Sequence, residues 1–570
     1  AESSYGLDGP WGAVTVSFGG FPSSYTTDQA QWQFLDLLPA GTWDSYILDV
    51  RACSKTDDSR CGAGGLWDRR NSSQCANSGV YMQGSVYAQT MSVGGGISGL
   101  PGATCYNSST VIVEEMSVRY PDGTNSTAIE IGYLALGAKS STQSFALSDK
   151  PDDVINTYNL PGFFYDNEIT SSNSFSLHYG AAVLGFKGSL IFGGYDKGRA
   201  IGSATTFGMR PPLLKDIVIG VEDGGSPFNF TSKSGLLFDE TGKSAQVPAF
   251  PDPITPYINL SRQTCDAIAD LLPVSFDARS GFYLWDVNDP SFTTIISSPA
   301  YLGFVFPPAP GSTDDVTIKV PLFLLNLTLD SQLVGGSDSV PYFPCMPFSM
   351  VGDATDSAWP TQGTYYLGRA FLQAAYYGRN WGAGVSWLAQ TPGPGSGDGL
   401  GYLPLDLIDS DTSIETFDDN GQLNASWAGH WTPIDKTTTP TPVNTHSSTP
   451  TMTASNNNTG LSTGAQAGIG VGVGVSVLLA LGLLFIFRRR HNARKHLLSG
   501  DARVHDTPAW AADDSNLRQK EKRQYVPEVV ASDRPHNETS KDYHELPNNI
   551  PELSSHEAPQ ELAGSSDRTT

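Results

Sequence analysis

The chain has 570 residues, of which 39% are hydrophobic and 16% charged, and it contains 60 glycines, 38 prolines, 23 tyrosines and 26 phenylalanines. This composition is typical of a turn-rich globular protein with the aromatic content of β structure, and the length suggests more than one core-bearing unit. The formal net charge of −24 excludes a general nucleic-acid binder, because such a protein needs a basic surface to neutralise phosphates.

The first residues, AESSYGLDGP, contain no apolar stretch of the kind that forms a signal peptide. The glycosylation sequons, cysteines and membrane span described below nevertheless indicate that the front of the chain is exported. Export requires a signal peptide, so we expect that one was removed before residue 1.

Short runs of β-branched and aromatic residues, each bounded by Gly, Pro, Asp or Asn, predict strands through the first 430 residues. The clearest runs are Val14–Phe18, Val111–Val113, Ser189–Phe192 and Val316–Val320. Helical patterns are few, and the best is Thr264–Leu272 with Ser261 as its N-cap. Many short strands with few helices predict a large, mainly β fold.

Two further features indicate that the front of the chain matures in the secretory pathway. N-x-S/T sequons occur at Asn71, Asn107, Asn125, Asn229, Asn259, Asn326, Asn424 and Asn457. All six cysteines also lie in the front part, at Cys53, Cys61, Cys75, Cys105, Cys265 and Cys345. We therefore expect N-linked glycans and disulfide bonds in this part of the chain.

The last quarter of the chain predicts a membrane anchor. Residues 436–466 are a Ser/Thr/Pro-rich stalk, and 467–487 are 21 residues without a charge, long enough for one transmembrane helix. Arg488–Arg490 follow at once, which places this side in the cytoplasm by the positive-inside rule. Residues 488–570 are polar, with 13 basic and 14 acidic side chains, and we expect a disordered cytoplasmic tail. The sequence thus predicts a single-pass type I protein of the plasma membrane or cell surface.

Five segments, in order between residues 10 and 410, resemble the pepsin-like aspartic proteases (peptidase A1 type). They are IGYLALG (131–137), SNSFSLHYG (172–180), GSLIFGGYDKGR (188–199), VPAFPDPITPYINLS (247–261) and YYLGRAFLQAAYYG (365–378). The membrane architecture resembles that of fungal cell-surface members of this group.

The resemblance implies two β-barrel lobes around a cleft, an N-terminal lobe at 1–200 and a C-terminal lobe at 201–430. It also implies that the chain crosses between lobes near 200–215 and that Tyr365–Gly378 is buried in the second lobe. In this family each lobe supplies one Asp on a D-T/S-G loop. The two carboxyls share one proton, so that the ionised one activates water and the protonated one polarises the scissile carbonyl.

Neither catalytic loop matches the family pattern. In the first lobe, LLPAGTWDSYIL (37–48) puts Pro39 at the catalytic Asp position, where no group can titrate. Asp44 and Asp49 lie nearby but are displaced from the apex of the loop. Asp49 is a conceivable substitute, although a carboxylate on a strand beyond the loop is the simpler interpretation.

In the second lobe Asp252 stands at the catalytic position, but Pro253 and Ile254 replace the Thr and Gly that follow it in the family. Pro253 lacks the hydroxyl and a backbone N–H, and Ile254 disfavours the tight turn that glycine permits. Asp252 can alternatively cap its own loop as an Asx-type turn residue. The sequence therefore predicts a pseudoenzyme.

Six cysteines allow 15 pairings, so the sequence alone does not fix the connectivity. The family pattern implies a Cys53–Cys61 and a Cys265–Cys345 disulfide, which leaves Cys75 with Cys105. The nine histidines form no zinc-binding motif, and we expect no metal and no cofactor.

Two functional interpretations stay open. The first is a non-catalytic surface protein that binds a peptide or glycan ligand in a degenerate cleft. The second is a membrane-anchored aspartic endopeptidase with an altered site. A second carboxyl group within hydrogen-bonding reach of Asp252 would favour the enzyme.

Overall fold

The computed structural model describes residues 3–436 apart from 20–31, 55, 57, 69–74, 82–83, 94–102, 115–117, 120–124, 127–128, 147–153, 279, 310, 335–337, 348–364 and 396–398. The predicted transmembrane segment and tail, most of the stalk, and the sequons at Asn71 and Asn457 lie outside the described residues, as do the side chains of Cys75 and Asn125. Within the described ranges, no helix is both long and apolar enough to span a membrane.

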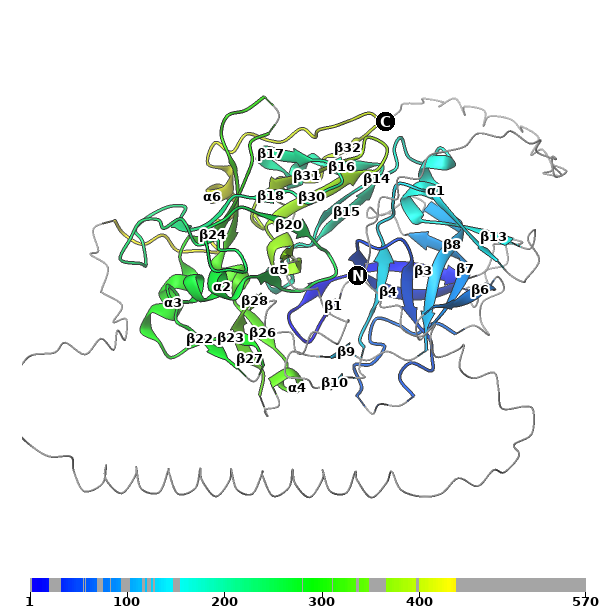
Figure 1. Cartoon of the computed structure of the whole chain (residues 1–570), viewed down its shortest axis with the longest axis horizontal. Helices are drawn as coiled ribbons and strands as arrows, with labels where there is room; N and C mark the ends of the chain where they lie inside the picture. Colours follow the sequence, from blue (N-terminus) through cyan, green and yellow to red (C-terminus); the bar gives the residue numbers. More distant parts are fainter. Residues whose placement is uncertain are drawn as a thin grey trace, which may run out of the picture. The chain divides into compact units, whose positions relative to one another are not determined.

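The fold is mainly β, as the sequence predicts, with 42% of the described residues in strands and 14% in helices. All described residues belong to one compact unit. For the description below, the first half denotes residues 3–200 and the second half residues 201–436. Figure 1 shows the strands of the two halves, with α1 beside the strands of the first half and α2 and α3 among those of the second.

The first half is built on one nine-stranded sheet. In spatial order its strands are β12 (Thr142–Ala146), β13 (Val154–Tyr158), β8 (Ala103–Val113), β5 (Ser45–Leu48), β11 (Gly132–Ala135), β4 (Trp32–Ala40), β3 (Val14–Gly19), β7 (Gly84–Val93) and β6 (Cys75–Tyr81). Because β7 also pairs with β8, the run from β8 through β5, β11, β4 and β3 to β7 closes on itself. Side chains such as Val16, Phe18 and Trp67 fill a core of this half.

The second half has three sheets of its own. One contains β18 (Leu213–Leu214), β20 (Val247–Pro251), β29 (Tyr365–Leu367), β21 (Ile258–Leu260) and β28 (Cys345–Pro347). The second contains β19 (Asp216–Val221), β24 (Ala300–Phe306) and β25 (Val316–Pro321), and the third β22 (Val274–Asp277), β23 (Phe282–Trp285), β27 (Val340–Phe343) and β26 (Leu327–Leu329). Their inner faces share one large apolar core.

A five-stranded sheet joins the two halves. It contains β15 (Ser189–Phe192), β14 (Ser174–His178), β30 (Ala375–Asn380), β31 (Val385–Gln390) and β17 (Ile201–Phe207). Strand β14 of the first half pairs antiparallel with β30 of the second, with Ser176 opposite Gly378. From β18 onward the strands pair within the second half, apart from β30 and β32 (Pro404–Asp406). Strand β30 pairs with β14, and β32 pairs with β16 (Gly194–Asp196) of the first half. The expected burial of Tyr365–Gly378 is confirmed, since only Tyr366 is partly exposed.

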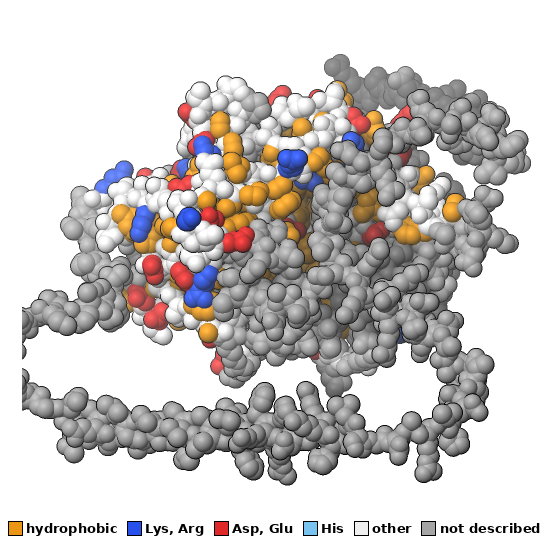
Figure 2. Space-filling model, in the orientation of Figure 1, with side chains coloured by type: hydrophobic (Ala, Val, Ile, Leu, Met, Phe, Trp, Pro, Cys, Tyr) orange, Lys and Arg blue, Asp and Glu red, His pale blue; other side chains and the backbone are white. Residues whose placement is uncertain are grey.

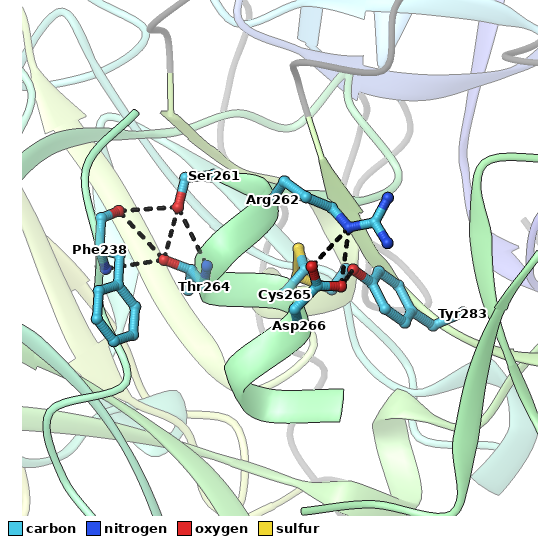
Figure 3. The surroundings of a disulfide bond; sticks show 8 residues. Phe238, Ser261, Arg262, Thr264, Cys265, Asp266 and Tyr283 are labelled. Carbon is cyan, nitrogen blue, oxygen red and sulfur yellow. Dashed lines mark hydrogen bonds and ion pairs between the residues drawn. A yellow bond between two sulfur atoms is a disulfide. The ribbon is translucent and has the colours of Figure 1, made fainter. Parts of the chain in front are cut away.

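The helices are short: α1 (Leu160–Asp166), α2 (Arg262–Ala269), α3 (Pro290–Ser297), α4 (Ser331–Val334), α5 (Arg369–Leu372) and α6 (Gln422–Ser426). The predicted N-cap of α2 is confirmed, because the Ser261 hydroxyl accepts a hydrogen bond from the Thr264 backbone N–H at 3.2 Å. The helix itself begins two residues before the predicted start and ends at Ala269. Figure 3 shows this end of α2 beside Cys265, whose disulfide with Cys345 ties the helix to β28.

Strand β14 buries a polar face as well as an apolar one. Its sequence SFSLH alternates, so that Phe175 and Leu177 join the large core while Ser174, Ser176 and His178 point to the other side. The His178 Nε2 lies 2.9 Å from the Gln373 carbonyl oxygen, and its Nδ1 has no hydrogen-bond partner among the described residues. Burial, together with the nearby Arg199 guanidinium, lowers the pKa of His178 to about 3.

This buried histidine predicts a loss of stability in acid. Between about pH 6.5 and pH 3 the unfolded chain binds a proton at His178 that the folded chain does not, so stability falls as the pH falls. We expect this group to lower the free energy of unfolding by about 2 kcal/mol between pH 7 and pH 5. Urea unfolding at the two pH values measures the change.

The substitution His178→Gln should remove this part of the pH dependence, because glutamine can still donate to the Gln373 carbonyl but does not titrate. His430→Gln is the matched control, because it makes the same substitution at a histidine that is only half-buried. Equal pH slopes for the His178→Gln variant and the unmodified chain would contradict the assignment.

Candidate functional site

The two loops that the sequence singled out are presented by the same arrangement of three strands. In the first half β11 lies between β4, with which it runs parallel, and β5, with which it runs antiparallel. In the second half β29 lies in the same way between β20 and β21. Each loop therefore leaves the end of one outer strand and returns as the other, and both loops end up at the junction of the two halves.

The strand registers define which residues of the two loops correspond. Pro39 pairs with Leu134, and Pro251 pairs with Leu367. If Tyr133 is the equivalent of Leu367, Asp252 corresponds to Pro39. If Leu134 is the equivalent, Asp252 corresponds to Ala40. Neither residue has a carboxyl group, so the first loop supplies no partner for Asp252.

The Asp252 carboxylate is engaged by its own loop. It accepts hydrogen bonds from the backbone N–H of Ile254 at 3.0 Å and of Thr255 at 3.2 Å, and from the Thr255 hydroxyl. Within the described part of the chain, no hydrogen bond joins this carboxylate to a second acid. The Asx-type cap that the sequence allowed is confirmed, and it explains how Pro253 and Ile254 are accommodated without the usual glycine.

The other two acids of the first loop region are also engaged. Asp44 accepts a hydrogen bond from the Ser109 hydroxyl at 2.6 Å, and burial raises the pKa of its carboxyl. Asp49 is buried and forms an ion pair with Arg51 at 2.7 Å, and Arg51 in turn contacts Glu114. Asp49 therefore holds the chain beyond β5 in place, which agrees with the simpler interpretation of this carboxylate.

Tyr179 connects the two loops directly. Its hydroxyl lies 2.8 Å from the carbonyl oxygen of Pro39 and 2.8 Å from that of Pro253, so one phenol can donate to either loop. The side chain is buried, and its ring meets Trp11 edge-on. The two loops approach closely here, since a Cβ on Gly41 would stand 3.9 Å from the Pro253 Cδ. The spacing of the loops is thus set by a residue that follows β14 in the joint sheet.

A buried arginine lies beside the second loop. Arg369, the first residue of α5, donates from Nη1 to the Ile254 carbonyl at 2.9 Å, and its guanidinium lies 5.0 Å from the centre of the Trp11 ring. Asp8 is 4.0 Å from Nη2 and accepts a hydrogen bond from the Trp11 indole at 2.7 Å. Asp8 and Trp11 belong to the hairpin of β1 (Ser4–Tyr5) and β2 (Trp11–Gly12), which is thereby fixed against the second half.

This arrangement holds the two loops together. One carboxylate is capped by its own loop, and the groups around it are a tyrosine and an arginine in contact with backbone carbonyls. A shared-proton mechanism needs two carboxyl groups in contact. Within the described residues no group of three His, Cys, Asp or Glu side chains is arranged to hold a metal ion.

The predicted disulfides and glycosylation sites differ in how far the structure supports them. The Cys53–Cys61 and Cys265–Cys345 disulfides are confirmed, whereas the Cys75–Cys105 pairing involves a side chain outside the described residues. Among the described sequons, Asn107 and Asn229 are exposed, and Asn326 and Asn424 are half-buried. Asn259 is only 1% exposed on β21, so the folded chain has no room for a glycan there and that expectation needs correction.

Sequence reasoning found both loops but missed Tyr179 and Arg369. Both residues lie in the segments that resemble the pepsin-like family, and neither occupies a position where the loop pattern asks for a functional side chain. No family model matches the chain, and no match is found among curated proteins.

Replacing Tyr179 with phenylalanine should destabilise the chain. The substitution keeps the ring but leaves the buried Pro39 and Pro253 carbonyls without their shared donor, which should cost about 1–3 kcal/mol. Denaturant unfolding measures the loss. The matched control is Tyr366→Phe, because Tyr366 is partly exposed and its substitution should change stability much less. Equal effects of the two substitutions would contradict the role of Tyr179.

Proposed function

We propose that this chain is a catalytically silent surface protein that uses a pepsin-like, two-lobe ectodomain to bind a peptide or glycan ligand. The observation that carries the proposal is the state of Asp252. Its carboxylate is bound by Ile254 and Thr255 of its own loop, while the opposite loop offers Pro39 and Ala40.

Several features support the pepsin-like architecture. The first half contains a closed run of six strands, and a five-stranded sheet is shared between the halves. Both loops are presented by equivalent three-strand units and meet at this shared sheet. These features agree with the order of the family-like segments in the sequence.

The contacts that hold the two loops together favour binding over catalysis. Tyr179 keeps the loops at a fixed spacing and Arg369 binds the second loop, although the reacting pair of acids is missing. A rigid junction without reactive groups can preserve a binding surface between two lobes, since fold and chemistry are separable. An endopeptidase with an altered site is the alternative, favoured by the retained placement of both loops, but Asp252 would need a second acid to polarise the substrate.

The proposal includes the membrane anchor. The uncharged segment 467–487, followed by Arg488–Arg490, would hold the ectodomain on the outer face of the plasma membrane through the Ser/Thr/Pro-rich stalk. A receptor or adhesion role fits such a display better than a role inside the cell.

Purified full-length chain should fail to cleave denatured protein substrate between roughly pH 3 and pH 6, the range in which carboxyl groups titrate. Pro39→Asp alone should not restore cleavage, because Pro253 and Ile254 still shape the opposite loop. Product formation is followed by mass spectrometry, and tryptophan fluorescence at each pH verifies that the chain is folded.

Cleavage by the unmodified chain that disappears in the Asp252→Asn variant would overturn the proposal and return the protein to the proteases. Peptide and glycan arrays probed with the same preparation test the binding half of the proposal, for which we expect saturable retention of one ligand class.

A further inference from the structure

One edge of strand β32 is unpaired within the part of the chain that the structure describes. Within the described residues the strand pairs only with β16, with Gly194 opposite Asp406 and Asp196 opposite Pro404. Two further hydrogen bonds extend this ladder, from the Lys197 N–H to the Leu403 carbonyl at 2.9 Å and from the Leu407 N–H to the Gly193 carbonyl at 3.0 Å.

These bonds determine which backbone groups face outward. In an antiparallel ladder the residues whose N–H and C=O groups point to the partner strand alternate with residues that point away. Leu403 and Leu407 point to β16, and so does Leu405 between them. The Asp406 N–H and C=O groups and the Pro404 C=O group therefore point to the open edge, where a further strand could pair with them.

The side chains beside this edge are unusually apolar for a surface. Leu405 and Leu407 pack inward, whereas Tyr402, Pro404, Asp406 and Ile408 are exposed. Tyr402 is 53% and Ile408 54% exposed, and the exposed Leu403 lies between them in the chain. Single exposed apolar residues are ordinary, but a contiguous group of them marks an interaction surface.

The exposed apolar group continues onto the neighbouring segment. The Leu407 N–H binds the Gly193 carbonyl, and a Cβ on Gly193 would stand 2.3 Å from the Thr170 Cβ, so the exposed Ile169 lies close to this end of the strand. Figure 1 shows β32 and β16 together, and Figure 2 shows hydrophobic and acidic side chains next to one another in the same area.

The charge at this edge is negative and uncompensated. The exposed Asp406 carboxylate takes part in no hydrogen bond or ion pair with described residues, while the nearby cations are occupied. Lys197 binds Glu415 at 2.8 Å, and Arg199 is buried beside Asp196. A cationic side chain from a partner would therefore find an acceptor at the centre of an apolar row.

We propose that the edge formed by Tyr402–Ile408 binds an extended segment of a partner protein, which adds to β32 as a strand and places a lysine or arginine against Asp406, between apolar side chains. Main-chain hydrogen bonds supply the pairing in this mode of recognition, and alternate side chains supply the specificity. A second copy of this chain is a poor occupant, because antiparallel pairing of two such edges would bring like charges together. This surface is separate from the two loops, so the inference does not depend on the proposed function.

The test uses full-length chain in detergent micelles and a fluorescein-labelled synthetic peptide of alternating valine and lysine. Fluorescence anisotropy should show saturable binding, and hydrogen exchange at the Asp406 amide should slow when the peptide is bound. Asp406→Lys should weaken binding about tenfold, or about 1.4 kcal/mol, with Asp406→Asn intermediate. Asp314→Lys is the matched charge reversal at another exposed acid and should leave the affinity unchanged.

A peptide methylated on its backbone amides separates strand pairing from simple charge attraction, because it keeps the lysines but cannot donate to the open edge. We expect it to lose binding. The proposal is overturned if the unmethylated peptide does not bind, if the methylated peptide binds equally well, or if Asp314→Lys weakens binding as much as Asp406→Lys. Thermal unfolding of each variant verifies that the exposed substitutions leave the fold intact.

Discussion

The hydroxyl of Tyr179 is the contact on which the junction of the two halves depends. It reaches the carbonyl oxygens of Pro39 and Pro253, and thus holds two loops that belong to different sheets. The residue before it, His178, ends β14, the strand that joins the first half to the second through β30. Tyr179 therefore sets the spacing of the two loops, and the adjacent His178 ends the strand that joins the sheets of the two halves.

This construction separates the architecture from the chemistry. Arg369 adds a second hold on the junction, because it binds the Ile254 carbonyl and packs on Trp11 of the N-terminal hairpin. Asp252, the remaining acid, serves the turn of its own loop. The buried His178 also lowers the stability of the folded chain in acid, the condition under which paired carboxyls are most effective. The open edge of β32 suggests that contacts with other proteins are made elsewhere on the molecule.

Much of the fold could be predicted from local patterns. The runs at Ser189–Phe192 and Val316–Val320 became β15 and β25 almost residue for residue, because alternation and flanking turn residues are local signals. The Asx-type cap at Asp252 could be anticipated for the same reason. Tyr179 could not, because its role depends on contacts 140 and 74 residues away in sequence. The burial of Asn259 could not be predicted either, because a sequon is defined by three neighbouring residues and carries no information on the sheet that buries them.

The central claim is that no second carboxyl acts with Asp252, and a statine-type transition-state inhibitor tests it most directly. The hydroxyl of such a compound replaces the attacking water and needs both acids of a catalytic pair. Isothermal titration of full-length chain with this inhibitor at acidic pH should give no binding heat, and Asp252→Asn should change nothing. Tight binding that is lost in the Asp252→Asn variant would contradict the account.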